Sequence, residues 1–213
     1  MSNGMSGNPH PVTYYVTPQL TGRNRLTCAF RFFLAIPHLL IAGGPGGTGL
    51  NFGGSFGFGG NGALGAVAVA TAVISWFAIV FTGKQPKGLW DLAAYYLRWR
   101  ANSITYAALL RDEYPPFGEG DYPAAFGLGD FPEERNRWNV GLRLFYLIPH
   151  LLILFFLGIA WAITALIGWL VILFTGSYPE GLYRFAVGYL RWSLRVEAYG
   201  LLMHDEYPPF AFD

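Results

Sequence analysis

Two histidines stand inside apolar runs of the chain, each directly after a proline and seven residues after an arginine. The runs read FRFFLAIPHLL and, later, LRLFYLIPHLL. A spacing of seven puts the arginine and the histidine on one face of a helix, two turns apart. A cation and an imidazole placed in this way can bind a lipid phosphate or line a proton or ion path. The two pairs are Arg31 with His38 and Arg143 with His150.

A structural role for these histidines is a third interpretation. Pro37 and Pro149 each remove one backbone donor from a helix and kink it. A histidine beside the break can then hydrogen-bond the freed backbone groups or a neighbouring helix. The arginine, in the first turns of the same helix, can extend its long side chain to the membrane surface. The sequence leaves the three interpretations open.

Other reactive groups are scarce. The chain has one cysteine, Cys28, and no H-E-x-x-H motif, so we expect no catalytic site, no bound metal and no cofactor. The segment GGPGGTG lacks the Lys-Ser/Thr that completes a phosphate-binding loop. We therefore predict a flexible connector whose aromatic side chains can anchor a partner. These aromatic residues are Phe52, Phe56 and Phe58.

The chain consists of two copies of one pattern. The blocks RNR, IPHLL, FTG, YLRW and DEYPPF each occur twice, in the same order. Matching residues lie 112 positions apart early in the pattern and 93 later, because the first copy carries an insertion in which 11 of 20 residues are glycine. The predicted division is a polar N-terminal segment at 1–24, repeat one at 25–117 with its glycine-rich insertion at 43–62, a linker at 118–136, repeat two at 137–210 and a tail at 211–213.

The composition indicates a membrane protein. Hydrophobic residues make up 53% of the chain and charged residues only 13%, whereas a soluble domain carries about 25% charged residues. Residues 144–179 contain no Asp, Glu, Lys or Arg, and this run is too long for one span of about 20 residues and long enough for two. We predict a hairpin that turns at Gly158, with helices at 138–157 and 159–175 and with Gly176 as a left-handed cap.

Repeat one predicts the same hairpin, with helices at 26–42 and 63–82 and with Gly83 as the cap. Each hairpin is followed by a segment, at 90–111 and 183–203, with polar residues at helical spacing on one face and aromatic residues opposite. Such helices suit the membrane–water boundary. The expected fold is all-α and integral to the membrane, with two tandem repeats in the same orientation, each a transmembrane helical hairpin plus an in-plane amphipathic helix.

The polar stripes of the two amphipathic segments carry different charges. Asp91 in repeat one stands where Arg184 stands in repeat two, and we predict a contact between them that pairs the repeats within one chain. Arginines on the second stripe also suit the binding of an anionic lipid. These arginines are Arg184, Arg191 and Arg195.

The repeated DEYPPF block ends each amphipathic segment, because two consecutive prolines stop a helix and force an extended turn. Its aromatic side chains either fold back onto the base of the hairpin or form a docking peptide for a partner. Ahead of the two RNR blocks, short strands are predicted at 11–17 and 124–128. The residues of the block are Tyr114, Pro115, Pro116 and Phe117 in repeat one and Tyr207, Pro208, Pro209 and Phe210 in repeat two.

The distribution of basic residues predicts the sidedness of the chain. Every Lys and Arg lies outside 32–83 and 144–183. Because Lys and Arg collect in short cytoplasmic loops, we expect both termini and the linker on the cytoplasmic side. No secretory signal opens the sequence, so we expect internal segments to insert the chain.

The order of IPH, FTG-x2-P-x-GL, YLRW and YPPF resembles a bacterial membrane family known as domain of unknown function 4389. Repeat two is the more similar, in FTGSYPEGLYRFAVGYLRWSLRVEAYGLLMHDEYPPF. Repeat one departs through its insertion and through KQPKGLW in place of SYPEGLY. The resemblance implies a multi-pass protein of the bacterial inner membrane. It implies no chemistry, because the family carries no assigned activity.

We expect a non-catalytic accessory or scaffold subunit of a larger membrane assembly. Its partners would be the lipid bilayer and other membrane subunits, and not nucleic acid, since the net charge is only +1 and lacks the basic surplus of nucleic-acid binders. Self-association is left open. One alternative is a small transporter or channel with a path lined by His38 and His150. Another is an anionic-lipid-binding protein that uses Arg31, Arg143 and the stripe arginines.

Overall fold

The computed structural model describes residues 10–45 and 62–212. They form a mostly helical fold with one antiparallel sheet of two strands. Asn24 and Asn136 cap two of the helices, because each side chain accepts a hydrogen bond from a backbone N–H of the first turn. In chain order the elements are β1 (Thr13–Val16), α1 (Arg25–Ala29), α2 (Arg31–Ala42), α3 (Gly62–Thr82), α4 (Lys87–Ala107), β2 (Ala124–Gly127), α5 (Arg137–Thr175) and α6 (Glu180–Gly200).

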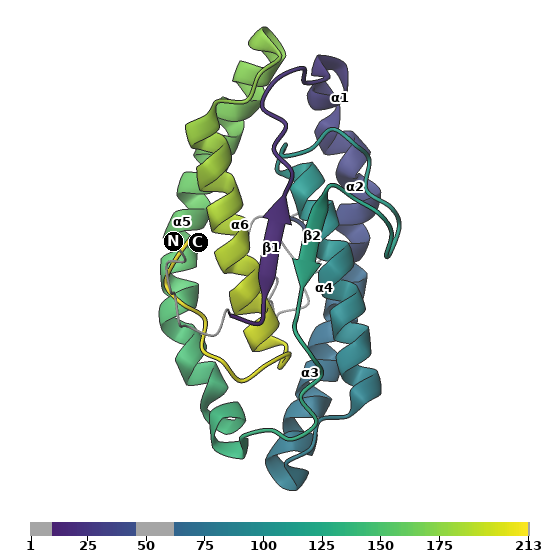
Figure 1. Ribbon diagram of the computed structural model, residues 1–213, viewed down its shortest axis with the longest axis vertical. Helices are drawn as coiled ribbons and strands as arrows, with labels where there is room; N and C mark the ends of the chain where they lie inside the picture. The colour runs from purple at the N-terminus through teal and green to yellow at the C-terminus, as the bar shows by residue number, and fades with distance from the viewer. Residues whose placement is uncertain (1–9, 46–61, 213) are drawn as a thin grey trace, which may run out of the picture.

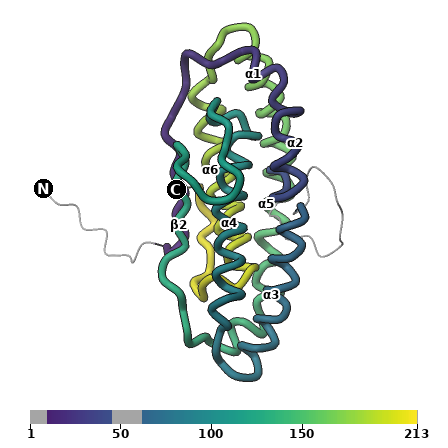
Figure 2. The backbone as a smooth tube through the Cα atoms, turned by 90° about the vertical axis from the view of Figure 1, so that its right-hand side faces the viewer, coloured from purple at the N-terminus to yellow at the C-terminus, as the bar shows by residue number. Residues whose placement is uncertain are grey.

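The elements form three layers. Strands β1 and β2 lie on one face of an elongated molecule, α4 and α6 form the middle layer, and α2, α3 and α5 cover the opposite face (Figures 1 and 2). An approximate half-turn about the viewing axis of Figure 1 exchanges the repeats: it places α5 on α2 and α3, α6 on α4, and β1 on β2. Both repeats therefore present the same kind of surface to each face of the molecule.

The predicted turn at Gly158 is wrong, because α5 is one helix of 39 residues that continues through this position. Its length is about 58 Å at ~1.5 Å per residue. Gly158 instead admits a close approach, since a Cβ built on it would lie 3.0 Å from the hydroxyl oxygen of Tyr189 on α6. Gly176, in contrast, is the left-handed cap that the sequence predicts, with φ 72° and ψ 17°.

The two helices predicted at the start of repeat one are present, but they do not form a hairpin. Helices α2 and α3 follow one another along the long axis of the molecule (Figure 2). Gly62, the first residue of α3, has φ +67°, and a Cβ there would lie 2.5 Å from the carbonyl oxygen of Ile41. The end of α2 thus abuts the start of α3. Together they take the place that the unbroken α5 takes in repeat two.

The amphipathic pattern of α4 and α6 predicts that they lie at an exposed boundary, but both helices lie in the middle layer. Each has 13 buried residues out of 21. Their polar side chains face the strand layer: the hydroxyl groups of Tyr14 and Thr105 are 2.6 Å apart, and Arg191 donates to the carbonyl oxygen of Tyr14. A helical stripe of polar residues looks the same in sequence whether water or a polar layer of the same chain covers it.

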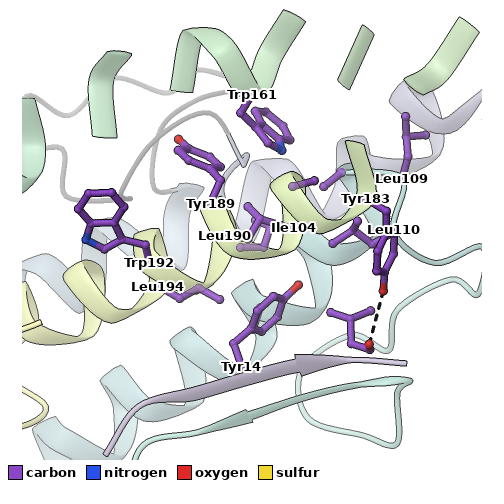
Figure 3. Close-up of a cluster of buried hydrophobic side chains, with 14 of the residues drawn as sticks. Tyr14, Ile104, Leu109, Leu110, Trp161, Tyr183, Tyr189, Leu190, Trp192 and Leu194 are labelled. Atoms are coloured by element: carbon purple, nitrogen blue, oxygen red, sulfur yellow. Dashed lines mark hydrogen bonds between the residues drawn. The ribbon is translucent and has the colours of Figure 1, made fainter. Parts of the chain in front are cut away.

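The strands predicted at 11–17 and 124–128 are confirmed as β1 and β2, which pair antiparallel with Tyr14 opposite Phe126. Figure 3 shows Tyr14 pointing from β1 toward the core between the helices. There, the rings of Trp161 on α5 and Tyr189 on α6 stack at a centroid distance of 5.6 Å. The strand pair therefore closes the side of the middle layer that faces away from α5.

The outer face of α2, α3 and α5 is apolar and exposed. Helices α3 and α5 are long and apolar enough to cross a membrane, and only 33% and 17% of their most apolar windows are buried. A core helix of a soluble protein would hide this surface, so the exposure favours membrane association. The large side chains on it include Phe32, Phe33, Leu40, Ile74, Phe77, Phe81, Phe145, Leu152, Phe155, Phe156, Ile163, Leu166 and Phe174.

Replacing Gly158 tests the continuity of α5. Gly158→Pro should destabilise the protein by about 3 kcal/mol or more, because proline removes a helical hydrogen bond and clashes with the preceding turn. Thermal unfolding in detergent measures the change. Gly141→Ala on the same helix is the matched control: a Cβ there meets no atom within 4 Å, so it should stabilise by roughly 0.5–1 kcal/mol. If Gly158→Pro were as stable as wild type, the result would contradict a continuous α5 and support the predicted hairpin turn at Gly158.

Candidate functional site: two repeated polar clusters

Repeat one holds an aspartate between two buried arginines. Asp112, just after α4, lies 2.7 Å from Arg23 and 2.6 Å from Arg31. The backbone N–H of Asn24 donates to the same carboxylate at 2.8 Å. The residue that opens α2 and the residue before α1 are thus tied to the end of α4. The cluster carries a formal charge of +1, from two guanidinium groups and one carboxylate.

Repeat two holds the same cluster at the matching positions. Asp205 lies 2.6 Å from Arg135 and 2.7 Å from Arg143, and the backbone N–H of Asn136 donates to it at 3.1 Å. The aspartates come from the repeated DEYPPF block and two of the arginines from the repeated RNR block. The sequence marks both blocks as repeated but does not indicate that they meet, because about 90 residues separate Arg23 from Asp112.

The sequence predicts that Arg31 and Arg143 extend to the membrane surface, but the structure buries both side chains. They are only 3% and 1% exposed. Arg31 also donates to the carbonyl oxygen of Tyr106 at 3.1 Å, and its guanidinium carbon lies 4.1 Å from the centre of that ring. Arg143 makes the same two contacts with Tyr199, at 3.0 and 4.2 Å. Each of the two arginines is thus paired with an aspartate inside the protein.

A strained turn delivers each aspartate to its arginines. Just after the ends of α4 and α6, Leu109 and Leu202 lie in the left-handed region, both at φ 63°. This conformation costs a residue with a side chain roughly 1–2 kcal/mol. The backbone N–H of Leu110 donates to the carbonyl oxygen of Thr105 at 3.1 Å, which is the pattern of a Schellman cap. The reversal brings Asp112 back toward the start of α2.

The surroundings of both aspartates favour their charged forms. Burial alone would raise the pKa of Asp112, but hydrogen bonds from Arg23 and from the backbone N–H of Asn24 outweigh it and leave that pKa below its usual value. Burial and Arg135 oppose each other in the same way at Asp205, whose pKa is also lowered. Both carboxylates are therefore ionised at neutral pH and hold their arginines as ion pairs.

Each histidine of the IPH blocks lies in an aromatic cage within its own repeat. His38 is fully buried, and its Nδ1 accepts a hydrogen bond from Nε1 of Trp99 at 3.0 Å. Phe117 stacks on the imidazole with a centroid distance of 4.4 Å, and Tyr114 packs beside it at 5.0 Å. The DEYPPF block thus folds back onto its own repeat, as the first of its two interpretations predicts.

The second cage has the same geometry. Nδ1 of His150 accepts from Nε1 of Trp192 at 3.1 Å, Phe210 stacks at 4.0 Å and Tyr207 lies at 4.8 Å. In each cage the accepting Nδ1 leaves the imidazole proton on Nε2. Nε2 of His150 has no hydrogen-bond partner among the residues that the structure describes. Trp99 and Trp192 are the tryptophans of the repeated YLRW block. The sequence shows that this block is repeated, but it does not indicate that the block contacts a histidine.

The stripe residues make local or backbone contacts. The predicted pair of Asp91 and Arg184 is wrong: Asp91 pairs with Lys87 at 2.8 Å and Arg184 with Glu180 at 2.5 Å, each within its own helix. Arg191 donates to the carbonyl oxygens of Tyr14 and Phe212. Arg195 donates to that of Val12. Of the three stripe arginines, Arg184 is exposed.

The other predicted partner-binding residues are the prolines of the two DEYPPF blocks and three phenylalanines of the glycine-rich insertion. Pro115 and Pro208 are buried, Pro116 is half-buried and Pro209 is exposed. The predicted anchors Phe52, Phe56 and Phe58 lie outside the described residues.

A buried ion pair joins the two repeats within the chain, which is the role predicted for the Asp91–Arg184 contact. Arg100 on α4 lies 2.7 Å from Glu197 on α6, and both side chains are 1% exposed. Tyr96 donates to the same carboxylate at 2.8 Å. The matching positions of the opposite repeat hold Ser193 and Ile104, so two copies of either repeat would lack the pair. The charge difference therefore favours pairing of repeat one with repeat two.

Replacing one residue of the Arg100–Glu197 pair should destabilise the protein more than replacing both residues. Glu197→Ile leaves the Arg100 charge buried without compensation and should cost about 3–5 kcal/mol, whereas Arg100→Met combined with Glu197→Ile should recover most of that loss. Unfolding in detergent gives the two values. Asp91→Asn at the exposed Lys87 pair is the control and should change stability by less than about 1 kcal/mol. Equal losses in the single and double variants would show that the charge pairing is unimportant.

The described residues contain no group of three or more His, Cys, Asp or Glu side chains that could hold a metal ion. The clusters that do exist join ionised groups to each other and to backbone carbonyls. Fold and clusters together define a helical, membrane-associated protein with repeated parts, in which Asp112, Asp205 and Glu197 pair with buried arginines.

The chain belongs to the family described as Domain of unknown function (DUF4389), whose pattern matches residues 61–118 and 137–211. The first match begins at the end of the glycine-rich insertion, which separates α2 from the matched region, whereas the second runs through all of α5. The family resemblance seen in the sequence is thereby confirmed. No curated protein and no solved structure matches the chain.

Proposed function

We propose that the protein is a non-catalytic accessory or scaffold subunit of a membrane protein assembly. The observation that carries the proposal is the contrast between the two faces of the molecule. Helices α2, α3 and α5 expose large apolar side chains, and Arg31 and Arg143 on them are buried. The exposed ion pairs of Lys87, Arg98 and Arg184 lie on α4 and α6. A protein built in this way offers neighbours in the membrane a wide apolar surface. The buried side chains of Arg31, Arg100 and Arg143 are occupied by internal ion pairs.

The proposed placement puts the apolar layer in the bacterial inner membrane and the strand layer, with both termini, on the cytoplasmic side. Helix α5, at ~58 Å, is longer than a hydrocarbon core of about 30 Å. Exposed charges also occur along the whole strand side, at Lys87, at the Arg98–Glu119 pair and at Arg184. The helices therefore lie along the membrane with the half-turn axis along its normal. This placement keeps the predicted sidedness and replaces the predicted hairpin crossings.

The cages weigh against a transporter with a histidine-lined path. Such a path needs both imidazoles to face one continuous route. His38 and His150 are instead each enclosed by a tryptophan, a tyrosine and a phenylalanine of their own repeat. This arrangement fits a structural role, in which histidine ties the YPPF segment and the last helix to the helix that carries the proline.

Cysteine labelling tests the placement. Positions 87 and 184 lie at the starts of α4 and α6, at opposite ends of the long axis (Figure 1). Both are exposed. Lys87→Cys and Arg184→Cys should react with a membrane-impermeant maleimide only after the cytoplasmic face is opened. Phe156→Cys on the apolar face should stay unreactive on both sides. Labelling of positions 87 and 184 from opposite sides would show that the long axis crosses the membrane.

Purification from the native membrane tests the subunit role. A tagged chain solubilised in a mild detergent should bring down other membrane proteins in fixed ratio, as seen by quantitative mass spectrometry. Ile163→Lys on the exposed face should lower their recovery, because a charge in an apolar interface is costly. Asp91→Asn, on the other side of the molecule, should not. Isolation of the chain alone, together with ion or solute flux in liposomes, would contradict the scaffold role and support the transporter.

A further inference from the structure

Two cavities open in the apolar layer, and the half-turn relates them. The larger, of about 520 Å³, lies between α2 and α5 and has Arg31 and Trp169 in its wall. The smaller, of about 240 Å³, lies between α5 and α3 and has Arg143 and Trp76 at the matching positions. Each cavity is therefore formed by the first part of one repeat and the second part of the other. We call them the α2–α5 cavity and the α3–α5 cavity.

One small side chain adds space to the α2–α5 cavity. Ala35 lines it, and the matching residue of repeat two is Leu147, which is buried in the core. Three heavy atoms fewer at this position leave space that leucine fills at the other site. The volume is in the range of about 300–1,000 Å³ that small-molecule sites have.

The α2–α5 cavity also contains hydrogen-bond donors without acceptors. Trp161 lines it and is 7% exposed, and its Nε1 has no partner among the described residues. The same holds for Nε of Arg31. In Figure 3 the ring nitrogen of Trp161 lies on the side away from Tyr189, toward Leu109, which also lines the cavity. A buried donor without an acceptor is destabilising, so an acceptor from a ligand would be stabilising.

The other tryptophans beside these cavities are satisfied within the chain. Nε1 of Trp169 donates to the carbonyl oxygen of Cys28 at 3.0 Å, and Nε1 of Trp76 donates to that of Val140 at 2.9 Å. Repeat one has Ala68 where repeat two has Trp161. The free indole donor is therefore a property of the α2–α5 cavity alone within this pair.

The surroundings define the chemistry of the ligand. The walls are apolar, and Phe32 and Leu166 at the rim belong to the exposed face that we place in the membrane. One end approaches the cluster of Arg23, Arg31 and Asp112, which carries a formal charge of +1. An apolar chain with acceptor oxygens and a negative head group fits all three properties.

We propose that the α2–α5 cavity binds one acyl chain of an anionic membrane phospholipid, with a lipid oxygen accepting from Nε1 of Trp161. The lipid fills the space that Ala35 leaves and joins α2 of repeat one to α5 of repeat two. The proposal requires the apolar layer to face lipid, but it does not depend on the role as a scaffold. A failed search for partner proteins would therefore leave it intact.

Lipid counting by native mass spectrometry tests the site. The full chain, purified in mild detergent, should retain one phospholipid. Ala35→Leu fills the cavity with the residue that repeat two already accommodates, and should lower the occupancy at least tenfold. Trp161→Phe keeps the ring and removes the donor, so it should weaken retention several-fold. Val73→Leu, which introduces into the α3–α5 cavity the side chain of its counterpart Leu166, should leave the count unchanged.

Phospholipids with brominated acyl chains locate the bound lipid. Vesicles of brominated phosphatidylglycerol should quench tryptophan fluorescence, and Trp161→Phe and Ala35→Leu should each reduce the quenching. Brominated phosphatidylcholine should quench less, and equal quenching would overturn the anionic head group. An unchanged lipid count in both variants would overturn the site. If Ala35→Leu left the number of bound phospholipids unchanged but altered the proteolysis of residues 46–61, the occupant of the cavity would be this segment of the chain and not a lipid.

Discussion

The aspartate that two buried arginines hold in each repeat is the interaction on which the rest of the fold depends. It joins the segment before the first helix, the start of the membrane-facing helix and the turn after the last helix. Asp112 does this for Arg23 and Arg31, and Asp205 does it for the matching pair. The charges must be paired because they are removed from water. The aspartate also fixes where the YPPF segment starts, and this segment then encloses the histidine.

Duplication gives the molecule two equal halves, and a few unequal residues decide how they join. The shared residues build one cluster and one cage per repeat. The unequal pair Arg100 and Glu197 lies between α4 and α6, so the contact requires one copy of each repeat. A second inequality, Ala35 against Leu147, adds space to one of two related cavities, which differ in size. Inequalities of this kind are where a duplicated protein acquires properties that its single repeat lacks.

The three layers separate the two solvents of a membrane protein. On the strand side, backbone carbonyls of β1 and the N-terminal segment accept from Arg191 and Arg195, so these two arginines of the α6 stripe are hydrogen-bonded within the chain. On the other side, α5 exposes aromatic and aliphatic side chains over most of its length. The middle layer is therefore covered twice, once by polar and once by apolar structure. This division supports a membrane-bound role that needs surfaces more than reactive groups.

The sequence by itself determined the repeats, the family, the two strands and the cap at Gly176, because these depend on local chemistry or on direct self-similarity. It also determined the apolar character of α3 and α5. Only the tertiary structure decided that α5 continues through Gly158, since an uncharged run of 36 residues suits either one long helix or a hairpin. It also decided which side chains meet. The partners of Arg31 and Arg143 lie 81 and 62 residues away, and no spacing rule along the chain specifies contacts at that distance.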